Sequence, residues 1–134
     1  MREVRQREGA GVELGEVRRA LAAAREAAPR EACGLLLSTP AGVTAVPRGM
    51  GTRTGFHIPA RELAEEVARG ELLGIWHSHP SGGPDLSAAD REGLWDGALA
   101  LVIGLLEPSA ALYRLEGGAP RLLRHWTPAV LADS

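Results

Sequence analysis

The feature that most constrains the fold of this chain is a series of short apolar runs, each bounded by glycine, proline or charged residues. Three of them, CGLLLS at 33–38, LLGIWHSH at 72–79 and ALALVIGLL at 98–106, are apolar over most of their length. Runs of this length and composition are typical of buried strands, and they are too short for helices between such breakers. The sequence therefore predicts a β-sheet with these runs as buried strands.

Segments between these strands carry apolar residues at helical spacing. A helix is predicted over 13–28, because its apolar residues fall on one stripe with Arg and Glu opposite. The stripe consists of Val17, Ala20, Leu21, Ala24 and Ala28. A second helix is predicted over 59–70, opened by a proline, with Leu63 and Val67 on its buried face. A third is predicted for SAADREGLW at 87–95.

Further strands complete the predicted sheet. VTAVPR at 43–48 follows the turn TPAG and should form a hairpin with the strand at 33–38. Short strands are also predicted for FHI at 56–58, AALYRL at 110–115 and RLLRHW at 121–126, the last at a sheet edge. Because strands and helices alternate along the chain, we expect an α/β fold with a mixed central β-sheet flanked by helices.

The glycine-rich segment GMGTRTG at 49–55 resembles a phosphate loop only superficially. Its spacing matches neither the dinucleotide nor the P-loop pattern, and the chain has no lysine for the latter, so a surface loop is predicted. No internal repeat or linker divides the sequence. We therefore expect one domain over 1–134, with a flexible lead-in at 1–11 and a tail at 127–134.

Composition excludes several classes of function. The net charge of -2 gives no electrostatic reason to expect nucleic acid or an anionic membrane as a partner. No apolar run approaches the ~20 residues of a membrane-spanning helix, and the N-terminus lacks the apolar core of a signal peptide. The single cysteine, Cys33, cannot form an internal disulfide, which agrees with a reducing compartment. A cytoplasmic protein is expected.

Two histidines, His77 and His79, end the run at 72–79. Alternate side chains of a strand lie on one face, so both imidazoles point the same way, with Cα atoms about 6.5 Å apart. Imidazoles at that separation can share one zinc ion, with bonds of ~2.0–2.1 Å. After a Gly- and Pro-rich return loop, Ser87 suits a helix N-cap and Asp90 falls in the first helical turn.

These residues allow a structural and a catalytic interpretation. Taken singly, a strand-end histidine is commonly structural, and Ser-x-x-Asp before a helix is commonly only a cap. Together, two same-face nitrogens and one oxygen make three protein ligands and leave a fourth position for water, which is the pattern of catalytic zinc. Structural zinc sites are usually closed by four ligands rich in cysteine, and this chain has one cysteine. We therefore expect a catalytic Zn²⁺ site.

A zinc-bound water needs a base that takes its proton and returns it to the leaving group. Glu31 is the best candidate among thirteen glutamates, because it directly precedes the buried strand at 33–38. The other chemistry-bearing residues are expected to be structural. Trp76 should pack in the core, Cys33 should be a buried free thiol, and Asp85 should be a surface charge of the loop. His57 and His125 have no motif partner.

The segment from His77 to Asp90 resembles the motif H-x-H-x7-S-x2-D of the JAMM (JAB1/MPN/Mov34) metalloproteases. REACGLLL resembles the glutamate-containing first strand of that family, and FHIPARELA the stretch before its second helix. The similarity covers about residues 12–115. It implies a sheet similar to that of cytidine deaminases, the JAB/MPN fold.

The resemblance also implies a role for each motif residue. Zinc would be held by His77, His79, Asp90 and a water. Glu31 would act as general base and acid, and Ser87 would donate a hydrogen bond to the oxyanion of the tetrahedral intermediate. A side chain that caps a helix is not expected to serve fully as an oxyanion donor as well, so the role of Ser87 stays open.

The implied activity is that of a zinc metallopeptidase or isopeptidase. The larger deubiquitinating relatives carry insertions that hold ubiquitin, and the short connections here leave no room for them. We therefore expect a compact prokaryotic-type enzyme that hydrolyses the C-terminal tail of a small ubiquitin-like or sulfur-carrier protein. Relatives of this fold often pair, so a homodimer is expected. The loop HPSGGP also resembles the RadC-like branch, which leaves the subfamily open.

Two other functions compete with hydrolysis. The first is that of a non-catalytic MPN-type binding or scaffold domain that keeps zinc for stability. The second is zinc-dependent deamination, which draws on Cys ligands in a C-x-x-C arrangement and is disfavoured by the lone Cys33.

Overall fold

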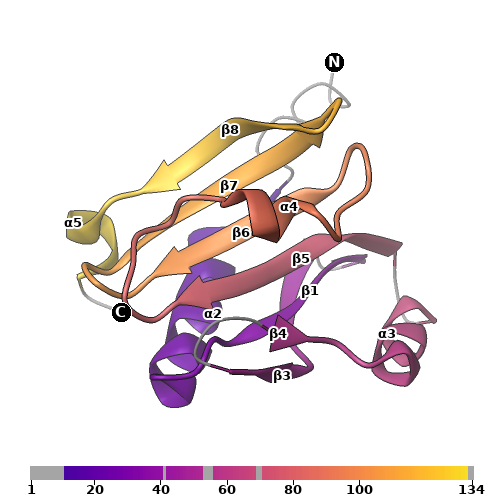
Figure 1. Cartoon of the computed structure of the whole chain (residues 1–134), viewed down its shortest axis with the longest axis horizontal. Coiled ribbons are helices and arrows are strands. Elements are labelled where there is room, and N and C mark those ends of the chain that lie inside the picture. The colour runs from indigo at the N-terminus through magenta and orange to yellow at the C-terminus, as the bar shows by residue number, and fades with distance from the viewer. Residues whose placement is uncertain (1–10, 41, 53–55, 69–70, 133–134) are drawn as a thin grey trace.

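The computed structural model describes residues 11–40, 42–52, 56–68 and 71–132. These residues form a six-stranded sheet in the order β2-β1-β5-β6-β7-β8 and a separate two-stranded sheet of β3 and β4 (Figure 1). The strands are β1 (Cys33–Thr39), β2 (Gly42–Pro47), β3 (Met50–Gly51), β4 (Phe56–His57), β5 (Glu71–His79), β6 (Leu99–Gly104), β7 (Ser109–Glu116) and β8 (Ala119–Trp126). The helices are α2 (Leu14–Ala27), α3 (Ala60–Val67), α4 (Ala88–Arg91) and α5 (Pro128–Leu131).

The six-stranded sheet is mixed. Its two central strands, β5 and β6, are parallel, with His77 opposite Val102, and every other pair of neighbours in this sheet is antiparallel. The predicted hairpin is confirmed, since Leu36 of β1 pairs with Ala45 of β2. The strand predicted over 121–126 is confirmed at a sheet edge as part of β8. The predicted α/β class with a mixed sheet and flanking helices is therefore correct.

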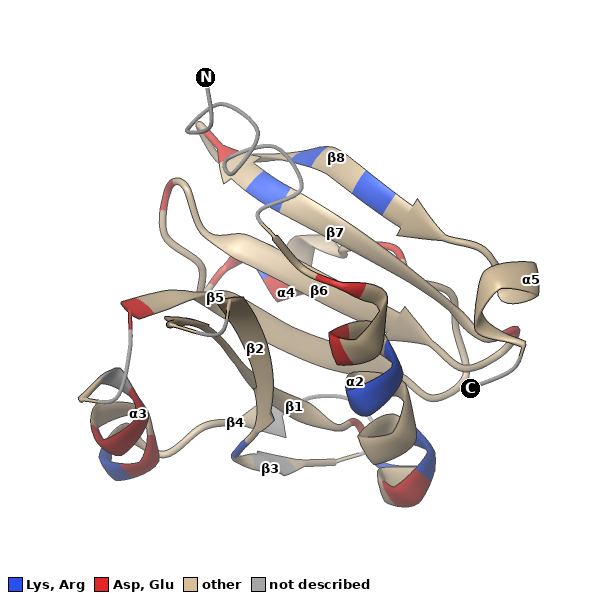
Figure 2. Ribbon diagram, turned by 180° about the vertical axis from the view of Figure 1, so that it is seen from behind, with Lys and Arg blue, Asp and Glu red and all other residues tan. Residues whose placement is uncertain are grey.

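The main core lies between the sheet and α2. Helix α2 lies across one face of the sheet, and α4 lies on the opposite face (Figures 1 and 2). Val17 and Leu21 of α2 are fully buried against Trp76 of β5 and Leu101 of β6. Trp76 thus packs in the core as predicted. Because side chains alternate along β5, the neighbouring His77 faces the side of α4.

Two segments differ from the prediction. The predicted loop at 49–55 contains β3, which pairs with β4 through Met50 and His57, while residues 53–55 lie outside the described part of the chain. The helix predicted over 87–95 ends at Arg91, and Gly93, which disfavours a continued helix, follows its C-cap residue Glu92.

The tail after Trp126 also carries structure. The hydroxyl of Thr127 accepts a hydrogen bond from the Val130 amide at 3.3 Å, which caps the short helix α5. Leu131 of α5 is fully buried in the main core. The predicted lead-in at 1–11 lies, except for Gly11, outside the described residues.

No helix in the described ranges is both long and apolar enough to cross a membrane.

Candidate metal centre

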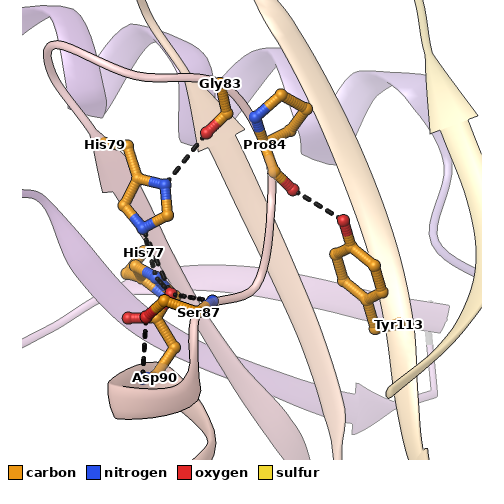
Figure 3. A network of polar contacts seen from close by, with 7 residues as sticks. All are labelled: His77, His79, Gly83, Pro84, Ser87, Asp90 and Tyr113. Carbon is orange, nitrogen blue, oxygen red and sulfur yellow. Dashed lines mark hydrogen bonds and ion pairs between the residues drawn. The ribbon is translucent and has the colours of Figure 1, made fainter.

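Two elements bring three potential metal ligands together on the α4 side of the sheet. His77 and His79 end β5, and the loop 80–86 turns the chain back so that α4 begins beside them (Figure 3). Asp90 lies in α4 and points toward both imidazoles. The structure therefore brings together the three predicted ligands, which form a group able to hold a metal ion.

The donor atoms of this group form a nearly equilateral triangle. The Nε2 atoms of His77 and His79 lie 3.2 Å apart, and each lies 3.2 Å from Oδ2 of Asp90. In a tetrahedral zinc site with bonds of ~2.0–2.1 Å, neighbouring ligand atoms are separated by about 3.3 Å. The spacing of the three atoms therefore fits a tetrahedral ion with one further position left over.

The ring of His79 is oriented by the return loop. Its Nδ1 lies 2.9 Å from the carbonyl oxygen of Gly83 (Figure 3). A carbonyl can only accept, so Nδ1 carries a proton, and the tautomer with its only proton there leaves the Nε2 lone pair for a metal ion. Metal-bound histidines are commonly held in this way by a backbone carbonyl.

Asp90 is also tied to the start of its own helix. Its Oδ2 accepts a hydrogen bond from the Ser87 amide at 2.9 Å, and its amide donates to Oγ of Ser87 at 3.1 Å, so the two residues form a capping box. Burial raises the pKa of the Asp90 carboxyl, but hydrogen bonds from His77 and Ser87 outweigh it and hold that pKa well below its usual range. The carboxylate is thus available as a charged ligand.

The site is open on one side. His77 is nearly buried, with 3% of its side chain exposed, whereas the side chains of His79 and Asp90 are 21% and 13% exposed. Ser87 is exposed beside them. Two of the three potential ligands, His79 and Asp90, are therefore partly accessible to solvent, next to the exposed Ser87.

The capping bond of Ser87 leaves part of its hydroxyl free. Oγ accepts from the Asp90 amide, which uses a lone pair and not the O–H hydrogen. The hydroxyl can cap α4 and still donate a hydrogen bond to a group above the site. Accepting and donating use different parts of the hydroxyl, so the two roles are compatible, and whether Ser87 also acts as an oxyanion donor stays a prediction.

Glu31 lies beside the same centre, just before β1. The amide of Ser78 donates to the Ala32 carbonyl at 2.9 Å, and the Ala32 amide donates to the Ser78 hydroxyl at 2.8 Å, which holds this segment against β5. Glu31 is buried, with 9% exposure. Burial raises the pKa of its carboxyl, while His77 and His79 act in the opposite direction.

The remaining candidates are not members of the donor group, although Cys33 pairs with His77 between β1 and β5. Cys33 is buried, and its thiol donates to the Arg48 carbonyl at 3.1 Å. Burial, with Glu31 and Glu62 as further causes, raises the pKa of this thiol to about 11. Asp85 is exposed in the loop, as predicted. His57 and His125, both exposed, do not belong to the group of potential ligands.

Sequence reasoning did not find the residues that hold the return loop. Tyr113 of β7 donates its hydroxyl to the Pro84 carbonyl at 2.9 Å (Figure 3). Gly104 at the end of β6 lets the loop approach so closely that a β-carbon there would lie 2.6 Å from the carbonyl carbon of Gly83. Both contacts depend on strands far along the chain, and no local motif indicates them.

Comparison with protein families shows to which family this chain belongs. A family model described as prokaryotic homologs of the JAB domain matches residues 14–116, which is most of the chain. The chain belongs to this family. The resemblance predicted from the motif is therefore confirmed, and Glu31 and the three potential ligands all lie within the matched part of the JAB domain.

A solved structure supports the same conclusion for the fold. The JAB domain is similar to the solution structure of protein DSY2949 from Desulfitobacterium hafniense, with 25% sequence identity and a TM-score of 0.65. The similarity covers 81% of this chain and 86% of that protein. No match was found among curated proteins. This JAB domain thus combines the fold of its family with a His77-His79-Asp90 group that could bind a metal, as in JAMM domains.

Proposed function

We propose that this JAB domain is a zinc-dependent metallopeptidase or isopeptidase. Its substrate would be the C-terminal tail of a small ubiquitin-like or sulfur-carrier protein, joined by a peptide or isopeptide bond. The observation that carries the proposal is the set of three donor atoms 3.2 Å apart, open on one side and flanked by the buried carboxyl of Glu31.

The donor set is suited to zinc. His77 and His79 would supply two imidazole nitrogens and Asp90 one carboxylate oxygen, and three protein ligands with an open fourth position are typical of catalytic zinc. When bound there, zinc would lower the pKa of a water to about 7 and polarise the carbonyl of the scissile bond. Gly83 would hold the His79 ring in the tautomer that leaves Nε2 for the ion.

Glu31 and Ser87 would perform the proton transfer and charge stabilisation. The carboxylate of Glu31 would take a proton from the attacking water and return it to the leaving amine. The free O–H of Ser87 would donate to the oxygen of the attacked carbonyl as negative charge develops.

The openness of the site supports an extended tail as substrate. Ser87 is exposed beside the partly exposed His79 and Asp90, so a narrow chain of small residues would approach the donor atoms there. A tail ending in Gly-Gly would fit such an approach. The proposed partner is this carrier protein, encountered in the cytoplasm, with neither nucleic acid nor membrane involved.

The test uses zinc-loaded full-length protein and several ubiquitin-like and sulfur-carrier proteins fused or isopeptide-linked to a reporter. Wild type is expected to release the reporter at the end of the carrier tail. Glu31→Gln should lower kcat by about 10²–10⁴-fold, the usual contribution of a general acid–base, with an unchanged zinc content. Glu26→Gln, on the exposed side of α2, is the matched control and should retain wild-type rates.

Failure to cleave any carrier or any member of a peptide library by the zinc-loaded wild type would contradict the hydrolase proposal. If a carrier still bound, with equal affinity for wild type and Glu31→Gln, a non-catalytic binding domain would explain the site instead. Light scattering of the purified protein tests the further proposal of a homodimer.

A further inference from the structure

The loop 80–86 needs external contacts to hold its shape. It has two glycines and two prolines, forms no helix or strand, and yet carries the carbonyl that orients His79. An ordered conformation of such a segment costs backbone entropy, which contacts with other elements must offset. The structure supplies these contacts from β6, from β7 and from the turn between them.

Backbone contacts fix the first half of the loop. The amide of Leu105 donates to the His79 carbonyl at 3.1 Å, and the amide of Leu106 donates to the Gly82 carbonyl at 3.2 Å. Gly104 lies directly before them, and a β-carbon at this position would collide with the backbone of Gly83 and Pro84. The end of β6 and the turn after it therefore support the loop from His79 to Gly83.

A side chain from β7 fixes the second half. The half-buried Tyr113 donates its hydroxyl to the carbonyl of Pro84 at 2.9 Å, from the far side of the loop relative to His79 (Figure 3). Burial, with the nearby charge of Asp85 as a further cause, raises the pKa of the Tyr113 phenol. The phenol therefore keeps its proton, and remains a donor, throughout the physiological range of pH.

We infer that Tyr113 is a positioning residue of the metal centre, which acts on His79 through the peptide between Gly83 and Pro84. That peptide carries the Gly83 carbonyl oxygen, which accepts from Nδ1 of His79. The ring of Pro84 fixes its φ angle near −65°, so only its ψ angle separates this peptide from the carbonyl that Tyr113 holds. Anchoring the Pro84 carbonyl therefore restricts rotation of the Gly83 carbonyl. The inference rests on the proposed metal-dependent function.

The loss of one phenolic hydroxyl, which does not belong to the ligand group, should therefore lower the affinity of the site for a metal ion. Removal of a partner that orients a ligating histidine typically lowers metal affinity 10–100-fold. Tyr113 acts on His79 indirectly, through one more peptide than the Gly83 carbonyl does. We therefore expect Tyr113→Phe to lose metal affinity near the lower limit of this range, roughly ten-fold. The three donor side chains themselves are unchanged in this variant.

The experiment measures metal binding rather than turnover. Metal-free wild type and Tyr113→Phe are titrated with Zn²⁺ against a chromophoric chelator, and with Co²⁺, whose visible absorption reports the geometry of its ligands. Tyr113→Phe should bind Zn²⁺ about ten-fold more weakly and show altered Co²⁺ bands. Thr39→Val is the matched control. It removes a hydroxyl at the turn between β1 and β2 that donates to the Gly42 carbonyl at 3.0 Å, and should bind both metals as wild type does.

Thermal unfolding of the metal-free proteins separates positioning from general stability. Both variants lose one hydrogen bond to a backbone carbonyl, so a purely structural role of Tyr113 would lower the Tm without changing the affinity or the Co²⁺ spectrum. That result, with wild type binding zinc, would overturn the inference and leave the proposed function intact. A wild type that binds neither metal would overturn both.

A second variant approaches the loop from β6. Gly104→Ala forces Gly83 and Pro84 away from the end of the strand, because the new β-carbon would lie under 3.0 Å from their backbone atoms. It should also alter the Co²⁺ spectrum of the folded protein. A folded Gly104→Ala protein with the wild-type spectrum would show that the position of the loop does not govern the metal centre.

Discussion

Gly51 lies in contact with the backbone of Glu31, so close that a β-carbon on Gly51 would fall 1.6 Å from the Glu31 carbonyl oxygen. The amide of Glu31 also donates to the Thr52 carbonyl at 2.6 Å. The strand β3 thus packs against the segment that carries the proposed base. Glycine is required at this position by the close approach alone.

The first prediction concerns this contact. Gly51→Ala must move β3 and the Glu31 segment apart, because a β-carbon 1.6 Å from an oxygen has to retreat to at least 3.0 Å. Misplacement of Glu31 by about 1 Å can lower turnover about 100-fold. Zinc affinity should stay close to wild type, because β3 contributes no ligand. Gly15→Ala in α2, where a β-carbon meets nothing within 4 Å, is the control and should keep full activity. Equal turnover of the two variants would contradict the role assigned to Glu31.

The second prediction concerns the two roles of the Ser87 hydroxyl. Ser87→Ala should cost about 1 kcal/mol of stability through the lost cap. It should also slow turnover roughly 10²–10³-fold through the lost oxyanion donor. Thr127→Ala, which removes the equivalent cap of α5, should cost a similar stability and leave turnover unchanged. Urea unfolding and steady-state kinetics on both variants provide the comparison, and normal kinetics of Ser87→Ala would leave that residue only its capping role.

The third prediction concerns removal of the ion. Zinc should stabilise the fold by about 2.7 kcal/mol when its free concentration is 100 times the Kd, and EDTA should reverse the effect. Asp90→Asn keeps an oxygen that can accept from the Ser87 amide but loses the ligand charge. Its Tm should therefore respond to zinc much less than that of wild type. A zinc-induced shift of equal size in both proteins would place the ion elsewhere.

The fourth prediction is the low reactivity of Cys33. Only the thiolate is alkylated, and a pKa of about 11, against an ordinary 9.0, leaves roughly 100-fold less thiolate at pH 8. Iodoacetamide should therefore label the native protein at least that much more slowly than the urea-unfolded protein, and the native rate should rise with pH toward 11. Similar labelling rates of the native and the unfolded protein at pH 8 would show that the thiol is not buried and that its pKa is not raised.

The sequence alone was sufficient for much of the fold because local patterns determined it. The continuous apolar runs at 33–38 and 98–106 became β1 and β6, both buried in the sheet. The period of two along β5 placed His77 and His79 on one face, and the Ser-x-x-Asp pattern became a capping box. Each of these features depends on residues close together in the chain.

The missed features depend on contacts between distant segments. Nothing near Tyr113 indicates that its hydroxyl meets Pro84, because the contact requires β7 to pass beside the return loop. Gly51 lies in a segment predicted to be a loop, and its tight contact with Glu31 arises only when β3 pairs with β4. The segment 87–95 was predicted to be one helix, whereas α4 ends at Arg91, two residues before Gly93.

The central claim is that His77, His79 and Asp90 hold one divalent ion, and metal analysis of purified protein dialysed against zinc tests it most directly. Wild type and Asp85→Ala, which removes an exposed carboxylate of the neighbouring loop, should each contain one zinc per chain, whereas Asp90→Ala should contain almost none. A wild type without zinc, or three proteins with equal zinc contents, would contradict the claim.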